Sequence, residues 1–190
     1  MHSFLTIADP HAARRMFLAR SGLVLSGAAV ALLAGRDALA ARSGAGRADD
    51  VRILNTALGA EHEAVAAYQL GAESGLLEKP ALSLALQFQG HHKEHVELLA
   101  QTVRKLGGSA VSARSKYDFP AHQLKTQADV LRFAAQLERG AVSAYLGAVP
   151  LFGNRDLAKA AASILGDEAM HWAVLRNALG EDPVPVAFVS

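Results

Sequence analysis

Hydrophobic and polar residues alternate with helical spacing along four long segments of this chain of 190 residues. Within each segment the apolar positions recur at intervals of three and four residues, which places their side chains on one face of a helix. The expected N-terminal caps are Asp49 or Asp50, Thr126 with Asp129 in a capping-box pattern, and Asp156. Pro80 suits the first turn of the second segment, and glycines lie near the ends of the segments. The pattern predicts helices over residues 50–75, 80–106, 126–149 and 156–179.

The connections between these helices differ in length. Short loops join the first helix to the second and the third to the fourth, whereas residues 108–125, which contain Pro120 and no apolar period, separate the second from the third. Short loops force neighbouring helices to be antiparallel, while a long one can return the chain along the bundle. We therefore predict an all-α fold, a four-helix bundle of two tandem helical hairpins joined by one long crossover.

The beginning of the chain has the pattern of a signal peptide. Arg14 and Arg15 precede the uncharged stretch 21–35, and Ala38-Leu39-Ala40 then supplies the small residues that a signal peptidase cleaves after, so cleavage is expected near Ala40/Ala41. The paired arginines, with Phe17-Leu18 one residue further on, resemble the twin-arginine export signal. An uncleaved membrane anchor with a chance arginine pair is the alternative interpretation.

This resemblance implies a location and a partner. Twin-arginine export carries a folded protein across the membrane, so the expected partner is the twin-arginine translocase and the expected location is periplasmic or otherwise extracytoplasmic. The mature domain would then lie outside the membrane. The predicted domain division is a signal peptide over 1–40, a linker over 41–49, the bundle over 50–180 and a C-terminal tail over 181–190.

Composition and charge exclude several classes of function. The 19 basic and 18 acidic residues give a net charge of only +1, so no field exists to attract a phosphate backbone and we expect no nucleic-acid partner. The chain has no cysteine, which excludes disulfides, thiolate zinc sites and iron–sulfur clusters. Any bound metal must therefore be held by histidine, aspartate or glutamate.

Ionisable residues interrupt the apolar face of every predicted helix near its middle. Because the helices are of similar length, these residues should meet at one level of the bundle. Burial of an isolated charge costs several kcal/mol of folding free energy. The charges must therefore be compensated, either by hydrogen bonding to one another or by a divalent cation. The candidate metal ligands are Glu61, His92, His95, Glu138, Glu168 and His171.

An internal repeat relates the two hairpins. Residues 61–68 and 138–145 are identical at five of eight positions, and residues 90–95 overlay residues 166–171 at nearly the same offset. The overlay pairs Glu61 with Glu138, His95 with His171 and His92 with Glu168.

One glutamate on each first helix and an E-x-x-H pattern on the second resemble the ferritin-like superfamily of di-metal carboxylate proteins, which includes rubrerythrin and bacterioferritin. The resemblance covers residues 50–180. It implies that Glu168 bridges two metal ions. The other implied ligands are the terminal carboxylates Glu61 and Glu138 and the imidazoles His95 and His171.

The sequence departs from the family at His92, which occupies the place of the second bridging glutamate. A neutral imidazole offers one free lone pair, because its other nitrogen carries a proton. His92 therefore cannot bridge two metals as a carboxylate does. We expect either an asymmetric metal pair held by Glu168 and solvent, or a single metal in the half that contains His92 and His95.

These observations favour an exported ferritin-like protein that binds one or two divalent metal ions, with iron or manganese preferred. Oxidase or peroxidase chemistry at the metal is a further step, and no residue pattern identifies a catalytic residue. The alternative is a metal-free helical stress or structural protein whose Glu/His cluster is mutually paired. A homodimer is a candidate assembly and a storage cage a more remote one. For Tyr68 and Tyr145, packing in the core is preferred over hydrogen bonding to ligands.

Overall fold

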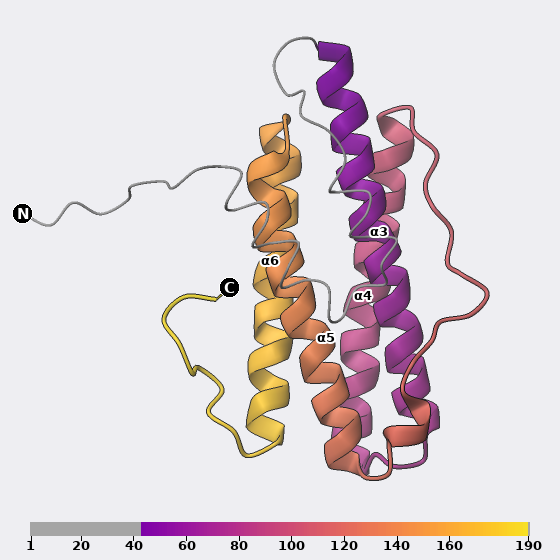
Figure 1. Ribbon diagram of the computed structural model, residues 1–190, viewed down its shortest axis with the longest axis vertical. Coiled ribbons are helices and arrows are strands. Elements are labelled where there is room, and N and C mark those ends of the chain that lie inside the picture. The colour runs from indigo at the N-terminus through magenta and orange to yellow at the C-terminus, as the bar shows by residue number, and fades with distance from the viewer. Residues whose placement is uncertain (1–42, 190) are drawn as a thin grey trace, which may run out of the picture.

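The computed structural model describes residues 43–189, and these fold into a bundle of four long helices (Figure 1). The predicted signal peptide over 1–40 lies outside the described residues. Short 3-10 helices precede and follow the third long helix, at Ala121–Gln123 (η1) and Val149–Leu151 (η2). The long helices are α3 (Ser43–Glu73), α4 (Lys79–Lys105), α5 (Gln127–Ala148) and α6 (Arg155–Ala178).

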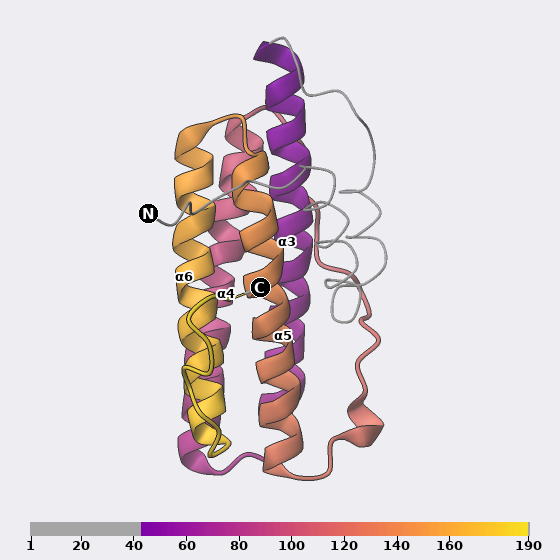
Figure 2. The same ribbon diagram turned by 60° about the vertical axis from the view of Figure 1, so that its left-hand side comes forward.

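The helices pack as two antiparallel hairpins, α3 with α4 and α5 with α6 (Figures 1 and 2). The crossover 106–126 runs along the outside of α3, so that α4 and α5 point in the same direction. Asn55 fixes the crossover to α3, because its amide donates to the Ser109 carbonyl at 3.0 Å and accepts from the Val111 N–H at 2.9 Å. The predicted all-α bundle with one crossover is confirmed.

Local sequence signals explain where the helices begin and end. Thr126 and Asp129 form the capping box that the sequence suggests at the start of α5, each side chain accepting from the other residue's backbone N–H. At the start of α6 the capping residue is Asn154 rather than the expected Asp156, whose N–H it accepts at 2.8 Å. Gly107 follows α4 with a φ of 83°, a conformation that favours glycine.

The predicted linker over 41–49 differs from the structure, in which α3 already begins at Ser43. Once packing fixes the later turns of a helix, each residue added at its end costs little, and Ala45, Arg47 and Ala48 are good helix formers that offset Gly44 and Gly46. Asp50, expected as a helix cap, therefore lies inside α3. It is buried and accepts from the Gly153 and Asn154 N–H groups at 2.8 and 3.1 Å, tying α3 to the loop between α5 and α6.

The apolar core is divided into two clusters. One is built around Leu58, Val103 and Ile164, and the other around Phe88, Leu131 and Leu175. The residues between them along each helix are the polar ones singled out above, so a buried polar layer separates two hydrophobic ones. Such a layer must be held together by its own interactions.

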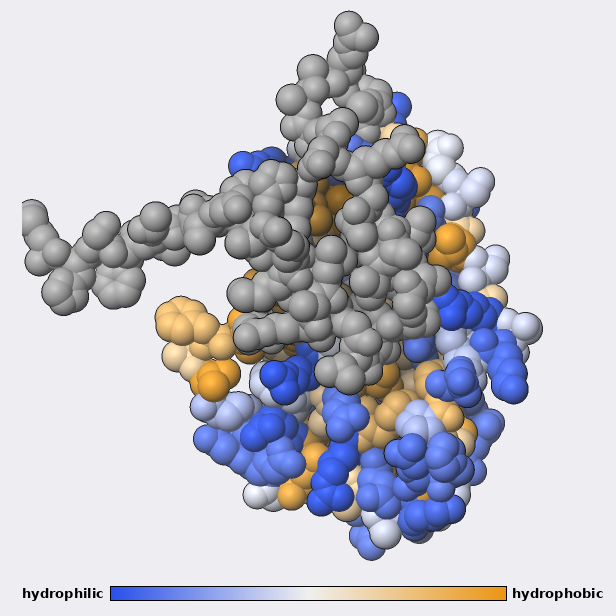
Figure 3. Space-filling view, viewed as in Figure 1, coloured by the Kyte–Doolittle hydropathy of each residue, from blue (hydrophilic) through white to orange (hydrophobic). Residues whose placement is uncertain are grey.

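Hydrophilic residues cover much of the lower part of the face shown in Figure 3, as expected for the outward faces of amphipathic helices. Within residues 43–189, no helix combines the length and the apolar character that crossing a bilayer would require.

Candidate metal centre

All six residues singled out in the sequence meet in the buried polar layer. They come from all four helices, and all are almost inaccessible to solvent except His95, whose side chain is 12% exposed. The six are Glu61 on α3, His92 and His95 on α4, Glu138 on α5, and Glu168 and His171 on α6.

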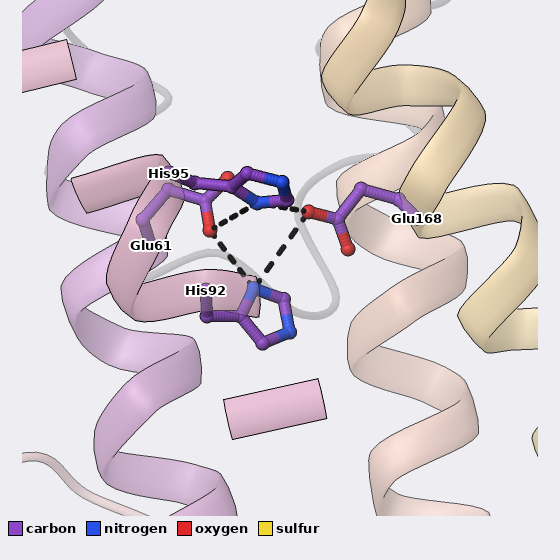
Figure 4. Close-up of side chains that lie close together, drawn as sticks. All are labelled: Glu61, His92, His95 and Glu168. Atoms are coloured by element: carbon purple, nitrogen blue, oxygen red, sulfur yellow. Dashed lines mark hydrogen bonds and ion pairs between the residues drawn. The ribbon is translucent and has the colours of Figure 1, made fainter. Parts of the chain in front are cut away.

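One half of the layer groups Glu61, His92, His95 and Glu168 (Figure 4). Glu61 Oε2 lies 2.8 Å from His92 Nδ1 and 3.4 Å from His95 Nδ1. Glu168 Oε1 lies 3.2 Å from His95 Nδ1 and 3.7 Å from His92 Nδ1. One donor atom from each of the four residues falls within 4.8 Å of the others, a spacing that fits ligands around a single ion.

The other half groups His92, Glu138, Glu168 and His171, again with donor atoms within 4.8 Å of one another. His171 Nδ1 lies 3.4 Å from Glu138 Oε1 and 3.5 Å from Glu168 Oε2. His92 Nε2 lies 3.2 Å from Glu138 Oε1. The layer therefore offers two adjoining groups of ligands.

Two residues belong to both groups. Glu168 turns Oε1 toward His95 and Oε2 toward His171, so its carboxylate spans the two halves. His92 also faces both, with Nδ1 beside Glu61 and Nε2 beside Glu138. Because a neutral imidazole has one free lone pair, His92 serves only one half at a time, whereas Glu168 serves both.

Five buried atoms of this layer make no hydrogen bond to the protein. Buried polar atoms are almost always satisfied, and leaving one unsatisfied costs about 1–3 kcal/mol. Carboxylate oxygens and imidazole nitrogens are also the donors that divalent cations prefer when no thiolate is present, so these residues fit a metal. The five atoms are His95 Nδ1, Glu138 Oε2, Glu168 Oε1, Glu168 Oε2 and His171 Nδ1.

Two tyrosines hold the terminal glutamates in place. The Tyr145 hydroxyl on α5 donates to Glu61 Oε1 on α3 at 2.6 Å, and the Tyr68 hydroxyl on α3 donates to Glu138 Oε1 on α5. Both rings are buried in the apolar clusters, as the preferred interpretation stated, but that interpretation was wrong about their hydroxyl groups. These orient candidate ligands, in the way that outer hydrogen-bond partners commonly do.

The histidines carry protons in the metal-free protein. Burial opposes the charged form of His92, but hydrogen bonds to Glu138 and Glu61 outweigh it and raise its pKa from 6.5 to about 11. Burial also lowers the pKa of His95, but hydrogen bonds to Glu168 and Glu61 outweigh it and raise this pKa to about 10. Glu138 and Glu168 likewise outweigh burial at His171 and raise its pKa to about 9.

The carboxylates and phenols shift in the complementary directions. Burial alone would raise the pKa of Glu138, but the neighbouring His171 and His92 reverse this and lower it well below 4.5. Burial and the adjacent Glu61 raise the pKa of Tyr145 well above 10, so its hydroxyl remains a donor. Without metal, the layer is thus a set of carboxylates neutralised by imidazolium groups.

Two residues outside the predicted set of ligands, Asp167 and His91, lie beside the layer toward its α4/α6 edge. Asp167 Oδ2 is 3.4 Å from His95 Nε2, 3.2 Å from His171 Nε2 and 3.1 Å from His91 Nδ1. Neither residue occupies a position of the predicted apolar faces. The internal repeat nevertheless overlays His91 on Asp167, and Asp167 precedes His171 by one helical turn. These two signals could have found them.

A small cavity of about 60 Å³ lies between α3 and α5. Six of the fourteen residues that line it are alanines of these two helices, and Glu61, His92 and Glu138 bound it on the side of the polar layer. The small side chains leave space that larger ones would fill. The cavity is large enough for a few water-sized molecules and reaches the candidate ligands.

Comparison with known proteins supports the fold. A solved structure of a conserved hypothetical protein, rv2844, from Mycobacterium tuberculosis is similar to this chain, with a TM-score of 0.65 and 23% sequence identity. The similarity covers 75% of this chain and 99% of that one. No curated protein matches the sequence.

A family model provides the assignment that these comparisons leave open. The model described as Ferritin-like domain matches residues 49–181, which include all four long helices except the first turns of α3. Its span also contains every candidate ligand described above. The chain therefore belongs to the ferritin-like domain family.

Proposed function

We propose that the bundle binds two divalent metal ions in its buried layer, one in each half, with Glu168 shared between them. The observation that carries this proposal is a set of five buried ligand atoms that make no hydrogen bond within the protein, all of which belong to candidate ligands. Glu168 contributes two of them, one facing each half. Cations between these atoms would satisfy ligand atoms to which the protein itself gives no hydrogen bond.

The donor set favours iron or manganese. Three carboxylates and three imidazoles combine hard oxygen ligands with borderline nitrogen ligands, and the chain has no thiolate that would select softer metals. If His92 binds through Nδ1, the half that contains Glu61 and His95 has four protein ligands. The half that contains Glu138 and His171 then has three. The two ions should therefore differ in affinity.

We further propose oxidase-like or peroxidase-like chemistry. A bound iron or manganese pair supplies electrons for the reduction of oxygen or peroxide. The chain's own contribution is to hold the ligands in place through Tyr68 and Tyr145 and to keep bulk water away with the two apolar clusters. The cavity between α3 and α5 admits a molecule of the size of such an oxidant.

We propose that the protein works outside the cytoplasm after twin-arginine export. The arginine pair at positions 14 and 15 and the apolar stretch that follows support this proposal. Export of a folded chain would allow the buried layer to be loaded in the cytoplasm. The test compares the wild type with the double variant Arg14→Lys, Arg15→Lys by cell fractionation after expression.

A metal-free structural protein is the second candidate, and one observation favours it. Both nitrogens of His92 are already hydrogen-bonded, to Glu61 and to Glu138, so this part of the layer is paired without an ion. The same does not hold for His95, Glu168 and His171, whose atoms facing the layer lie 3.2 to 3.5 Å from one another in ion pairs but make no hydrogen bond.

Metal analysis separates the two candidates. Protein folded in the cytoplasm and purified without chelators should carry about two iron or manganese ions per chain, and Glu168→Gln should lose both the second ion and most of the metal-induced rise in melting temperature. With free metal at about 100 times its dissociation constant, binding contributes about 2.7 kcal/mol of stability. Glu97→Gln, an exposed position on α4, is the control. An absence of metal in the wild type, with no loss in Glu168→Gln, would leave only the structural candidate.

A further inference from the structure

A third group of ligand atoms lies outside the buried layer, at the edge where α4 meets α6. His91 Nδ1, Asp167 Oδ2 and His171 Nε2 are within 4.8 Å of one another. His91 Nδ1 lies 3.1 Å from Asp167 Oδ2 and 2.9 Å from His171 Nε2. Two imidazoles and a carboxylate form a recognised ligand set for a divalent cation.

This outer group is open to solvent, unlike the buried layer. The side chain of His91 is 36% exposed and that of Asp167 is 21% exposed, whereas His171 is only 2% exposed. A hydrated cation can therefore reach the first two ligands without any movement of the bundle. The third ligand belongs to the interior.

His171 connects the outer group to the buried layer through a single ring. Its Nε2 faces Asp167 at 3.2 Å, and its Nδ1 lies 3.5 Å from Glu168 Oε2 without a hydrogen bond. The ring of Phe88 stacks on it, with centroids 4.0 Å apart, and holds it in this position. The two nitrogens of one imidazole thus point into two different ligand groups.

We propose that His91, Asp167 and His171 Nε2 form an outer site that captures a divalent cation from solvent and passes it to the buried pair. This inference rests on the proposed metal binding of the layer. Capture through His171 Nε2 requires this nitrogen to give its proton to solvent, while Nδ1 keeps its own. Transfer inward requires Nδ1 to give up its proton and Nε2 to take one back from solvent, because an imidazole nitrogen cannot hold a proton and a cation together.

The shared ring makes the outer site self-limiting. When an ion in the buried layer is bound by His171 Nδ1, His171 Nε2 carries a proton, which it donates to Asp167, and the outer group loses one ligand. The outer site is therefore complete only while the adjoining half of the layer is empty. A fully loaded chain should hold two ions rather than three.

Two substitutions at His91 distinguish capture from a merely structural role. In His91→Glu the residue keeps a metal ligand but loses the donor that contacts Asp167, while in His91→Gln it keeps an N–H donor but becomes a poor ligand. His91 lies at the surface, so both variants should fold. His122→Glu and His122→Gln, at an exposed histidine of η1, control for the change in charge.

The experiment follows the loading of the full metal-free chain with Co²⁺, by stopped-flow absorption and by fluorescence of Trp172, the single tryptophan. Capture predicts that His91→Gln loads at least about tenfold more slowly than the wild type, with the same final two ions, since features that raise the local concentration of a binding ion increase association rates by this order. His91→Glu should load at nearly the wild-type rate. Neither His122 variant should change the rate.

Other results overturn the inference. If His91→Gln loads like the wild type while His91→Glu is impaired, His91 acts only as a hydrogen-bond donor to Asp167. If all variants load at one rate, the outer group has no part in loading. These two results leave the proposed function intact, because the wild type still binds Co²⁺. A wild type that binds no Co²⁺ at equilibrium overturns the proposed function and this inference together.

Discussion

Tyr145 on α5 donates a hydrogen bond of 2.6 Å to Glu61 on α3, across the seam between the two hairpins. Tyr68 on α3 makes the reciprocal hydrogen bond to Glu138 on α5. Each hairpin therefore orients the terminal glutamate of the other. The cavity lined by alanines lies along the same seam, so these hydrogen bonds join the two helices where apolar packing is thin.

Tyr145→Phe tests this arrangement. The change removes the donor to Glu61 Oε1 without creating a large cavity, and it leaves a buried carboxylate oxygen unpaired. We expect the metal-free protein to lose about 1–3 kcal/mol of unfolding free energy, measured with urea, and the loaded protein to bind metal about 10–100 times more weakly.

Tyr117→Phe in the crossover is the matched control for this substitution, because the Tyr117 hydroxyl contacts only the backbone N–H of Arg114 on the surface. It should change neither quantity measurably. Equal effects of the two substitutions would show that the hydroxyl of Tyr145 does not orient Glu61.

The stability of the metal-free protein should fall as the pH rises above 6.5. The folded-state pKa values of His92, His95 and His171 are raised from 6.5 to about 11, 10 and 9, so their contribution is complete below pH 6.5 and is lost progressively as the pH passes through these values. Glu138 acts in the opposite sense, because its lowered pKa contributes stability above pH 4.5 that is lost on acidification. Maximum stability is therefore expected between these limits.

Urea unfolding of chelator-treated protein at several pH values measures this trend. One unit of pKa shift corresponds to about 1.4 kcal/mol, so a loss of at least this size is expected between about pH 6.5 and 9. Glu138→Gln removes the partner of His92 and His171 and should flatten the curve. A rise in stability over this interval would contradict the protonated state of the histidines.

Helical spacing and the internal repeat together place the six candidate ligands at one level of the bundle. Residues three and four apart lie on one face, so Glu168 and His171 must project in the same direction, and the internal repeat brings Glu138 to the level of Glu61. The crossover follows from loop lengths in the same way. These predictions needed no knowledge of side-chain conformation, and the fold they describe is the one observed.

Helical spacing cannot specify the orientation of a histidine ring or the partners of residues beside the apolar face of a helix. Whether a histidine turns Nδ1 or Nε2 toward the layer depends on its rotamer and its neighbours. Here Asp167 forms ion pairs with the Nε2 atoms of both His95 and His171, so their Nδ1 atoms face the layer. Asp167 itself does not occupy a position of the predicted apolar face. Asp50 was also unpredictable, because its partners lie in a loop about one hundred residues away along the chain.

Asp50→Ala should destabilise the bundle without affecting metal binding. The Asp50 carboxylate accepts from two backbone N–H groups of the loop between α5 and α6, and those groups would lose their partners. We expect a loss of about 1–3 kcal/mol in unfolding free energy and an unchanged metal content.

The neighbouring Asp49 provides the control for this change. It pairs with Arg52 on the surface, where ion pairs contribute about 0–1 kcal/mol, so Asp49→Ala should have a small effect. A larger loss in Asp49→Ala than in Asp50→Ala would show that the loop does not depend on Asp50.

Metal binding should release protons, because imidazolium groups cannot coordinate a cation. At neutral pH His92, His95 and His171 are protonated in the metal-free protein, as their pKa values of about 11, 10 and 9 require. Each ligand proton displaced makes the apparent affinity rise about tenfold per pH unit. Affinity for Mn²⁺ should therefore increase steeply between about pH 6.5 and 8, in the direction opposite to the stability of the metal-free protein.

Calorimetric titration with Mn²⁺ in buffers of different ionisation enthalpy counts these protons directly. The wild type should release two to three protons on full loading, one for each histidine of the layer that becomes a ligand. His171→Gln should release one fewer, whereas His122→Gln, at the surface, should match the wild type. If full loading releases no protons, the histidines are either neutral beforehand or not ligands, and the arrangement of Glu168 between His95 and His171 would then need another explanation.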